Sequence, residues 1–180
     1  MTDHPNTDAL PLDQSSRPLW APWRIEYIRG IKEGSCFICQ AVENPGSAAD
    51  QLVIARSEHT LLMLNAFPYN AGHVLVAPLR HVADLSGLEP AELSEMMTML
   101  LQIKAVIQTL MVPDGFNVGF NLGAAAGAGL RDHVHGHIVP RWIGDTNFMP
   151  VLDGTRVVPE ALAETAAMLR EAWREGAAKS

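Results

Sequence analysis

Three histidines occupy alternate positions late in this 180-residue chain, at His133, His135 and His137. The segment 132–140 that contains them is rich in β-branched residues and ends in a proline, which is typical of a β-strand. In a strand the three imidazoles would share one face, about 7 Å apart from one to the next. A helix would turn His135 away from the other two, and Gly136 disfavours a helix. We therefore predict a strand over 132–140.

Chain length and composition favour a single globular domain. With 48% hydrophobic residues, the chain can bury one substantial core. Residues 1–18 are largely polar and are predicted to form a mobile tail, which leaves 19–180 as one domain. No apolar stretch is long enough to cross a bilayer, so we expect no membrane partner and a cytoplasmic location.

The charge of the chain argues against one broad class of function. Its formal net charge is −7 at pH 7, whereas general nucleic-acid binding requires a basic face that displaces counterions. We expect no nucleic-acid partner. If the ligand is an anion, groups at the site itself must attract it.

Short apolar segments bounded by turn residues predict the remaining strands, at 52–56, 60–65, 73–78 and 116–122. Helical periodicity predicts a long helix over 89–111 and a C-terminal helix over 159–177. The methionines of the long helix are expected in core or dimer packing rather than in ligand binding. The resulting fold class is α+β, an antiparallel sheet of about five strands with helices packed on it.

A segment of glycine and alanine, 123–129, connects the strand at 116–122 to the histidines. It is either a flexible connection or a loop whose backbone N–H groups can approach an anion closely. Three roles fit the neighbouring histidines: metal ligands, a polar face without function, or an imidazole that attacks phosphorus. The loop favours the last role, because backbone amides can hold phosphate oxygens while a neutral imidazole attacks.

The only two cysteines, Cys36 and Cys39, are too close in sequence for a disulfide that staples the fold. They are expected on a turn that opens a short helix, a usual setting for half of a zinc knuckle. A redox pair and two buried thiols without metal are the alternatives.

Two of these segments resemble the signature of the histidine triad (HIT) family. The segment 133–139 resembles its His-x-His-x-His motif followed by apolar residues, and 65–76 resembles its Asn-x-x-Pro-x-x-x-Gly-His motif. With the loop 121–129, the resemblance covers about 36–150 of the chain in the family's order. The flanking segments 20–24 and 144–150 further resemble the bacterial branch that includes diadenosine tetraphosphate phosphorylase-like members.

The resemblance implies a HIT-like fold and an enzyme that cleaves the α-phosphate bond of a dinucleoside polyphosphate. His135 would attack the phosphorus to give a nucleotidyl-histidine, with its other ring nitrogen held by a backbone carbonyl. His137 would bind the phosphate or the bridging oxygen of the leaving group. Water or inorganic phosphate would then release the nucleotide. A nucleoside phosphoramidate hydrolase and a non-catalytic nucleotide-binding module are the alternatives.

The resemblance also implies a nucleotide-binding set, which consists of Asn65, Phe67, Asn121, Gly127, Ala128, Gly129 and His137. In this set Asn65 would bind the ribose and Phe67 would contact the base. The alternatives are that Asn65 only caps the end of a strand and that Phe67 is a core residue. Some branches of the family hold a structural zinc with four ligands, which would be Cys36, Cys39, His81 and His133 here. Members also pair, so the resemblance implies a homodimer.

Four further residues have expected places. His59 and His73 are expected to be structural. Gly136 stands where the family motif usually has a larger residue, which would loosen the strand and open space near the nucleophile. Arg141 is expected on the face of the strand opposite the histidines, in solvent.

Overall fold

The computed structural model describes residues 36–126, 130, 132–145 and 162–177. The predicted tail over 1–18 and the phosphate-loop candidates Gly127, Ala128 and Gly129 lie outside the described residues.

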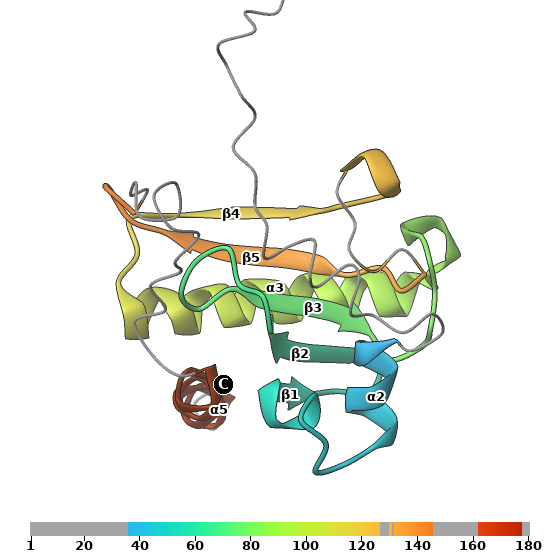
Figure 1. The fold of residues 1–180 in the computed structure, drawn as a ribbon, viewed down its shortest axis with the longest axis horizontal. Helices are drawn as coiled ribbons and strands as arrows, with labels where there is room; N and C mark the ends of the chain where they lie inside the picture. The colour runs from blue at the N-terminus through green and yellow to red at the C-terminus, as the bar shows by residue number, and fades with distance from the viewer. Residues whose placement is uncertain (1–35, 127–129, 131, 146–161, 178–180) are drawn as a thin grey trace, which may run out of the picture.

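The described residues form one five-stranded sheet with the order β1-β2-β3-β5-β4 (Figure 1). Its strands are β1 (Val53–Arg56), β2 (Thr60–Leu64), β3 (Val74–Pro78), β4 (Gly115–Phe120) and β5 (Gly136–Arg141). Every neighbouring pair is antiparallel. The predicted α+β class and number of strands are therefore confirmed.

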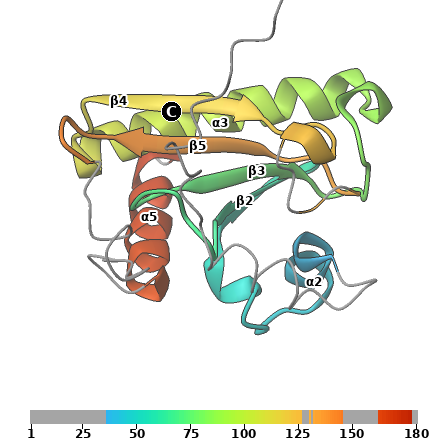
Figure 2. The same ribbon diagram turned by 45° about the horizontal axis from the view of Figure 1, so that its top comes forward.

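Helices pack on both faces of this sheet (Figures 1 and 2). The long helix α3 (Pro90–Met111) covers one face together with α5 (Leu162–Ala177), and α2 (Phe37–Glu43) packs on the other. Short 3-10 turns occur at η1 (Asp50–Leu52), η2 (Leu85–Gly87) and η3 (Ala124–Ala126). No helix in the part of the chain that the structure describes is both long and apolar enough to cross a membrane.

The ends of α3 follow from its sequence. Pro90 occupies the first turn, where its missing N–H is not needed. Glu89 and Glu92 form a capping box in which each side chain accepts a hydrogen bond from the other residue's backbone N–H. The helix ends at Val112, which adopts a left-handed conformation with φ of 48°.

Alternation along the central strands divides the core into two clusters, one on each face of the sheet. The cluster under α3 and α5 includes Leu62, Leu64, Val74, Val76, Met96, Met99, Ile103, Ile138, Ala166 and Leu169. The cluster under α2 includes Ile38, Ala41, Val53, Leu61, Met63, Leu75 and Ala77. Burial of Met96 and Met99 confirms the core role predicted for methionines of α3.

The strand predicted over 132–140 is shorter in the structure, because β5 begins only at Gly136. The backbone N–H of Val134 donates to the carbonyl of Val82, 2.6 Å away, instead of joining the sheet. Pairing of β5 with both of its neighbours begins at Gly136, which lies opposite Val76 of β3 and opposite Phe120, the last residue of β4. His133 and His135 therefore lie in an irregular segment, and only His137 belongs to the strand.

Candidate active site

His135 has one ring nitrogen engaged and one available. Its Nδ1 lies 2.8 Å from the backbone carbonyl of His133, which can only accept, so Nδ1 carries the proton. Nε2 of this neutral imidazole then carries no proton and presents a lone pair. Burial lowers the pKa of His135, which is 7% exposed, so the ring is neutral at pH 7. The geometry matches the carbonyl contact predicted for a nucleophile.

His137 lies beside His135, with ring centroids 4.9 Å apart in an edge-on arrangement. It pairs with Leu75 across the sheet, and so it faces the α2 side. Its Nδ1 is 3.0 Å from Nε2 of His73, and its Nε2 is 3.4 Å from the amide of Asn121. Two of the predicted site residues, His137 and Asn121, are thus brought together.

His73 was not among the predicted site residues, although it is fully buried against His137. Antiparallel pairing places it there: Leu75 lies opposite His137, and His73 precedes Leu75 by two residues. That spacing puts His73 on the same face of the sheet. If the register between the strands predicted at 73–78 and 132–140 had been known, the contact between His73 and His137 could have been predicted.

The loop between β2 and β3 holds the predicted ribose and base contacts. The side-chain oxygen of Asn65 accepts from the N–H of Phe67 at 2.9 Å, so Asn65 caps this turn. Phe67 is 43% exposed and is not a core residue. Gly72 has φ of +70°, and a Cβ there would lie 2.6 Å from Sδ of Met111, so this tight turn requires glycine.

A pocket of about 320 Å³ opens beside His137, between β5 and the edge strand β4. It is lined by Tyr69, Asn117, Val118, Gly119, Phe120, Asn121, His137, Val139 and Arg141. The pocket adjoins the nucleophile candidate, because His137 contacts both.

The predicted face of Arg141 was wrong, although the residue is exposed as predicted. His137 and Arg141 are four residues apart on β5, so they share a face, and both line the pocket. The guanidinium is paired with Asp145 at 2.6 and 2.9 Å and donates to Asn117 at 2.7 Å. The hydrogen bonds that Arg141 donates to Asp145 raise the pKa of Arg141 and hold a fixed positive charge at the pocket wall.

Gly136 does not open space near His135, contrary to the prediction. It belongs to the opposite face of β5, and a Cβ there would lie 2.9 Å from Cγ1 of Val76 and 3.0 Å from the ring of Phe120. Core side chains therefore fill the space that a larger residue would take.

Four predicted metal ligands converge next to α2, and their ligand atoms all lie within 4.8 Å of one another. Sγ of Cys36 is 3.3 Å from Nδ1 of His133, and Sγ of Cys39 is 3.2 Å from Nδ1 of His81. Ligand atoms around a tetrahedral zinc, with bonds of about 2.0–2.3 Å, lie roughly 3.5 Å apart. The cluster could therefore hold a metal ion.

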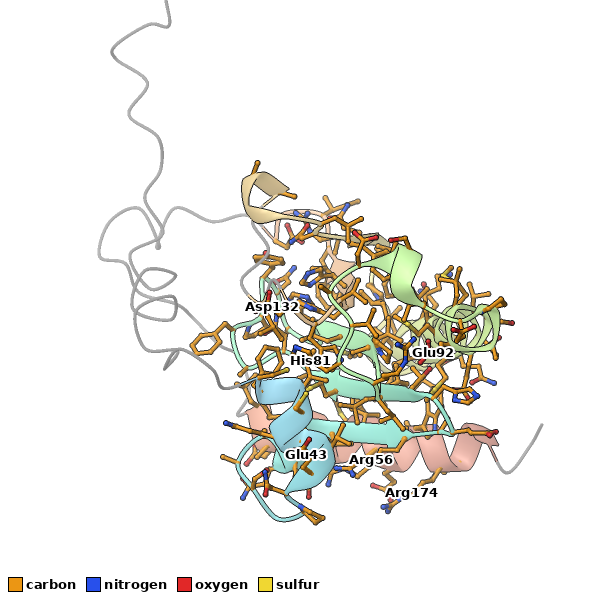
Figure 3. The ribbon with its side chains drawn as sticks, turned by 90° about the vertical axis from the view of Figure 1, so that its right-hand side faces the viewer. Glu43, Arg56, His81, Glu92, Asp132 and Arg174 are labelled. Atoms are coloured by element: carbon orange, nitrogen blue, oxygen red, sulfur yellow. The ribbon has the colours of Figure 1, made fainter. Side chains whose placement is uncertain are left out.

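The chain around the cluster orients these ligands. Cys36 is the N-cap of α2 and accepts from the N–H of Cys39, so one helix start positions both thiols. Nε2 of His133 donates to the carbonyl of Pro78 at 2.8 Å, which turns Nδ1 toward the cysteines. Figure 3 shows His81 beside α2, while Glu92 lies on α3 at the other side of the sheet.

Protonation at the cluster is set mainly by burial. Burial lowers the pKa of His133 to about 4, so its imidazole is neutral and able to bind a metal at pH 7. Burial also raises the pKa of the Cys39 thiol to about 11. A metal would have to displace that proton on binding.

Sequence comparisons relate this chain to proteins that process nucleotides. A family profile described as HIT domain matches residues 47–142. The AP-4-A phosphorylase of Mycobacterium tuberculosis is 38% identical over 168 residues, which cover 89% of this chain and 86% of the relative. An asymmetrical bis(5'-nucleosyl)-tetraphosphatase of Schizosaccharomyces pombe is 36% identical over 89 residues, 49% of this chain and 48% of the relative.

Comparison with solved structures gives the same relationship. The crystal structure of a Zn-bound histidine triad family protein from Mycobacterium smegmatis superposes with a TM-score of 0.66 at 28% identity. The match covers 81% of this chain and 98% of that protein.

Proposed function

This chain belongs to the HIT domain family, and from that premise we propose that it is an enzyme cleaving the α-phosphate bond of dinucleoside polyphosphates such as diadenosine tetraphosphate. One observation carries the proposal: His135 is buried and neutral, with Nδ1 tied to a backbone carbonyl and Nε2 unprotonated. An imidazole in that state can attack phosphorus without an activating base. The name of the M. tuberculosis relative supports the choice of substrate.

The proposed chemistry has two steps. Nε2 of His135 attacks the α-phosphorus in line with the bond to the bridging oxygen, which leaves with the rest of the polyphosphate. The new N–P bond makes the ring cationic, and the carbonyl of His133 stabilises that charge through the Nδ1 proton. Water or inorganic phosphate then attacks the same phosphorus and frees His135.

The substrate would lie along the loops at this end of the sheet. Asn121, next to His137, and the backbone amides of Gly127, Ala128 and Gly129 would bind the phosphate oxygens. Asn65 would bind the ribose, and Phe67, whose side chain is 43% exposed, would contact the base. The pocket beside His137 would take the leaving part of the polyphosphate.

We also assign a structural zinc to the cluster of Cys36, Cys39, His81 and His133. Four protein ligands complete a tetrahedral coordination shell and leave no open position for a substrate. Zinc would therefore fix the start of α2 against His133 rather than take part in catalysis. The Zn-bound relative from M. smegmatis supports this choice of metal.

A homodimer is supported by one exposed stripe of α3. Leu93, Met97 and Leu101, spaced four residues apart, are 40%, 41% and 61% exposed. Strand β4 is an edge of the sheet, and its Val118 is 49% exposed. Large apolar side chains, and a strand edge that no described residue pairs with, favour a second copy of the chain as their partner. A cytoplasmic location remains a prediction from the sequence.

Product analysis by mass spectrometry tests the function. Diadenosine tetraphosphate would be incubated with wild type, His135→Ala and His59→Gln, each with and without inorganic phosphate. His59→Gln is the matched control, since this partly exposed histidine has its side chain next to Glu58, away from the site. We expect ADP and ATP only with phosphate for a phosphorylase, or AMP and ATP without it for a hydrolase. Only His135→Ala should be inactive.

Two results would contradict the proposal. Turnover by His135→Ala at the wild-type rate would remove His135 as the nucleophile. A wild type that binds the substrate without cleaving it would favour the binding module. In that case adenosine 5'-phosphoramidate would be the next substrate, because the phosphoramidate hydrolase would cleave it.

A further inference from the structure

Cys36 and Cys39 form a pair of thiols that the proposed nucleotidyl transfer does not use. They are the only cysteines of the chain, and both are half-buried and free of disulfides. The N–H of Cys39 donates to Sγ of Cys36 at 3.4 Å, and the two sulfurs lie within 4.8 Å of each other. One turn of the chain therefore holds the two thiols side by side, and the chain has no third thiol that could compete for either.

The cluster that contains this pair is open to solvent on one side. His133 is buried, whereas His81 is exposed. Sγ of Cys39 is 3.2 Å from Nδ1 of His81, so the exposed imidazole lies directly beside a thiol. A small oxidant can therefore reach the pair from the side of His81.

The spacing of the two thiols suits a local disulfide. Two residues separate them, as in the Cys-x-x-Cys motifs that alternate between dithiol and disulfide. A disulfide needs its sulfurs about 2.05 Å apart and its Cα atoms roughly 4.4–6.8 Å apart. Cys36 is the N-cap of α2 and Cys39 lies in its first turn. Rotation of the two side chains, rather than unwinding of α2, can therefore bring the sulfurs together.

We propose that Cys36 and Cys39 form a reversible modification site, at which hydrogen peroxide converts the two thiols into one disulfide. One sulfur attacks an oxygen of the peroxide and becomes a sulfenic acid, while the O–O bond breaks and water leaves. The second sulfur then attacks the first, the S–O bond breaks, and another water leaves. The thiols lose two electrons and two protons in total, and the peroxide takes them up as it becomes two waters.

The disulfide would also affect the proposed nucleophile. It removes two of the four ligands that could hold a metal, and two histidines are too few for a tetrahedral site. Phe37, between the cysteines, meets the ring of His135 edge-on at 6.4 Å, and the carbonyl of His133 fixes the proton on Nδ1 of His135. Oxidation should therefore slow nucleotide turnover, and reduction should restore it. This consequence rests on the proposed function, whereas the disulfide itself does not.

Peptide mass spectrometry tests the disulfide directly. Trypsin cleaves after Lys32 and Arg56, so the peptide 33–56 contains both cysteines and none of the eight methionines. Oxidation of methionine therefore leaves the mass of this peptide unchanged. The full-length protein would be treated with hydrogen peroxide and then alkylated. We expect a peptide about 2 Da lighter than the reduced one and without the alkyl label, and dithiothreitol should restore labelling of both thiols.

Cys36→Ser is the matched control. It keeps Cys39 beside His81 but removes the second thiol, so a sulfenic acid on Cys39 cannot become an internal disulfide. Dimedone, which traps sulfenic acids, should label Cys36→Ser and leave wild type almost unlabelled. The proposal would be overturned by wild-type thiols that stay fully alkylated at a peroxide concentration that oxidises the methionines. A sulfinic acid, or a disulfide between two chains, in place of the internal disulfide would overturn it as well.

Two further readouts on the same samples relate the disulfide to the metal and to activity. A zinc-sensitive dye should report release in proportion to the disulfide formed. Turnover of diadenosine tetraphosphate should fall at least about 10-fold and recover with dithiothreitol and zinc. Unchanged turnover by the oxidised protein would overturn the effect on His135. A disulfide in protein that purifies without zinc would support the modification site and contradict the zinc assignment. Reduced protein without turnover would contradict the proposed function, and the peptide mass would still decide whether the disulfide forms.

Discussion

The backbone carbonyl of His133 lies 2.8 Å from Nδ1 of His135, while the imidazole of the same His133 lies 3.3 Å from Sγ of Cys36. One residue therefore belongs to the cysteine and histidine cluster that could hold a metal, and it also fixes the proton of the nucleophile candidate. Phe37, which follows Cys36, meets the ring of His135 edge-on at 6.4 Å. A structural change at the cluster should therefore affect His135 both through the carbonyl of His133 and through the ring of Phe37.

The first prediction concerns metal removal. If zinc binds this cluster, a chelator should lower the melting temperature by about 5–15 °C, because the folded state loses a ligand bound at roughly 100 to 1,000 times its Kd. Activity should fall over the same range of chelator concentration, since the carbonyl of His133 loosens with the cluster. Calorimetry and turnover on the same samples would measure both, with zinc added back to restore them.

Cys39→Ser provides the matched variant for that experiment, because it removes one ligand while it keeps the size of the side chain. Before any chelator is added, Cys39→Ser should already melt at the lower temperature expected for chelated wild type. Adding the chelator should then change its melting temperature little. Loss of activity at an unchanged melting temperature would instead indicate a catalytic metal and would contradict a structural zinc.

The second prediction concerns acid stability. Two hydrogen bonds from Arg80, at 2.7 and 3.0 Å, hold the pKa of the buried Glu92 at about 2, below its ordinary 4.5. The folded state thus prefers the ionised carboxylate. Its contribution is complete above about pH 4.5 and is lost as the pH falls toward 2. Glu92→Gln should lower the free energy of unfolding by about 1–2 kcal/mol at pH 7.

Urea unfolding of wild type and Glu92→Gln between pH 2 and pH 7 would measure this difference. The two proteins should converge at the acid end. Glu175→Gln, on the exposed surface of α5, is the control and should follow wild type throughout. A difference of constant size across the pH range would show that the effect does not come from the charge of Glu92.

The sheet could be predicted from sequence because its signals are local. Short apolar segments and turn residues located four of the five strands to within about two residues, and helical periodicity located α3. The start of β5 could not be located in this way. Whether His133 and His135 join the sheet depends on where pairing with β3 and β4 stops and on the distant carbonyl of Val82.

The proximity of His135 to His137, and the convergence of the four cluster ligands, could be predicted because these residues belong to motifs. The contact between His73 and His137 was not predicted, and the face of Arg141 was predicted wrongly, because both depend on which residue lies opposite which across the sheet. A shift of one residue in register reverses the face of a side chain, and a single sequence does not fix that register.

The third prediction concerns assembly. Leu101→Glu places a charge at the most exposed residue of the stripe of α3, where burial in a dimer would be costly. Light scattering should give twice the 19.6 kDa chain mass for wild type and a single chain mass for Leu101→Glu. Gln102→Glu puts the same charge on the next exposed residue, outside the stripe, and should remain a dimer. A monomeric wild type would contradict the proposed assembly.

The fourth prediction concerns Gly136, whose place in the histidine motif is explained by packing. A methyl group there would lie 2.9 Å from Cγ1 of Val76 and 3.0 Å from the ring of Phe120, both closer than ordinary contact. Gly136→Ala should therefore lower the free energy of unfolding by about 1–2 kcal/mol through overpacking, which thermal or urea unfolding would measure. Gly119→Ala is the matched control, because a Cβ on that neighbouring strand meets no atom within 4 Å.

A compensating change separates overpacking from a backbone effect. Phe120→Leu removes part of the ring that the new methyl group would touch, at its own cost in core packing. If steric contact is the cause, Gly136→Ala should cost less in the Phe120→Leu background than in wild type, and the double-mutant cycle should give a coupling of at least about 0.5 kcal/mol. Strictly additive effects would mean that the methyl group is accommodated elsewhere, and Phe120 would then not be the reason that glycine occupies this position.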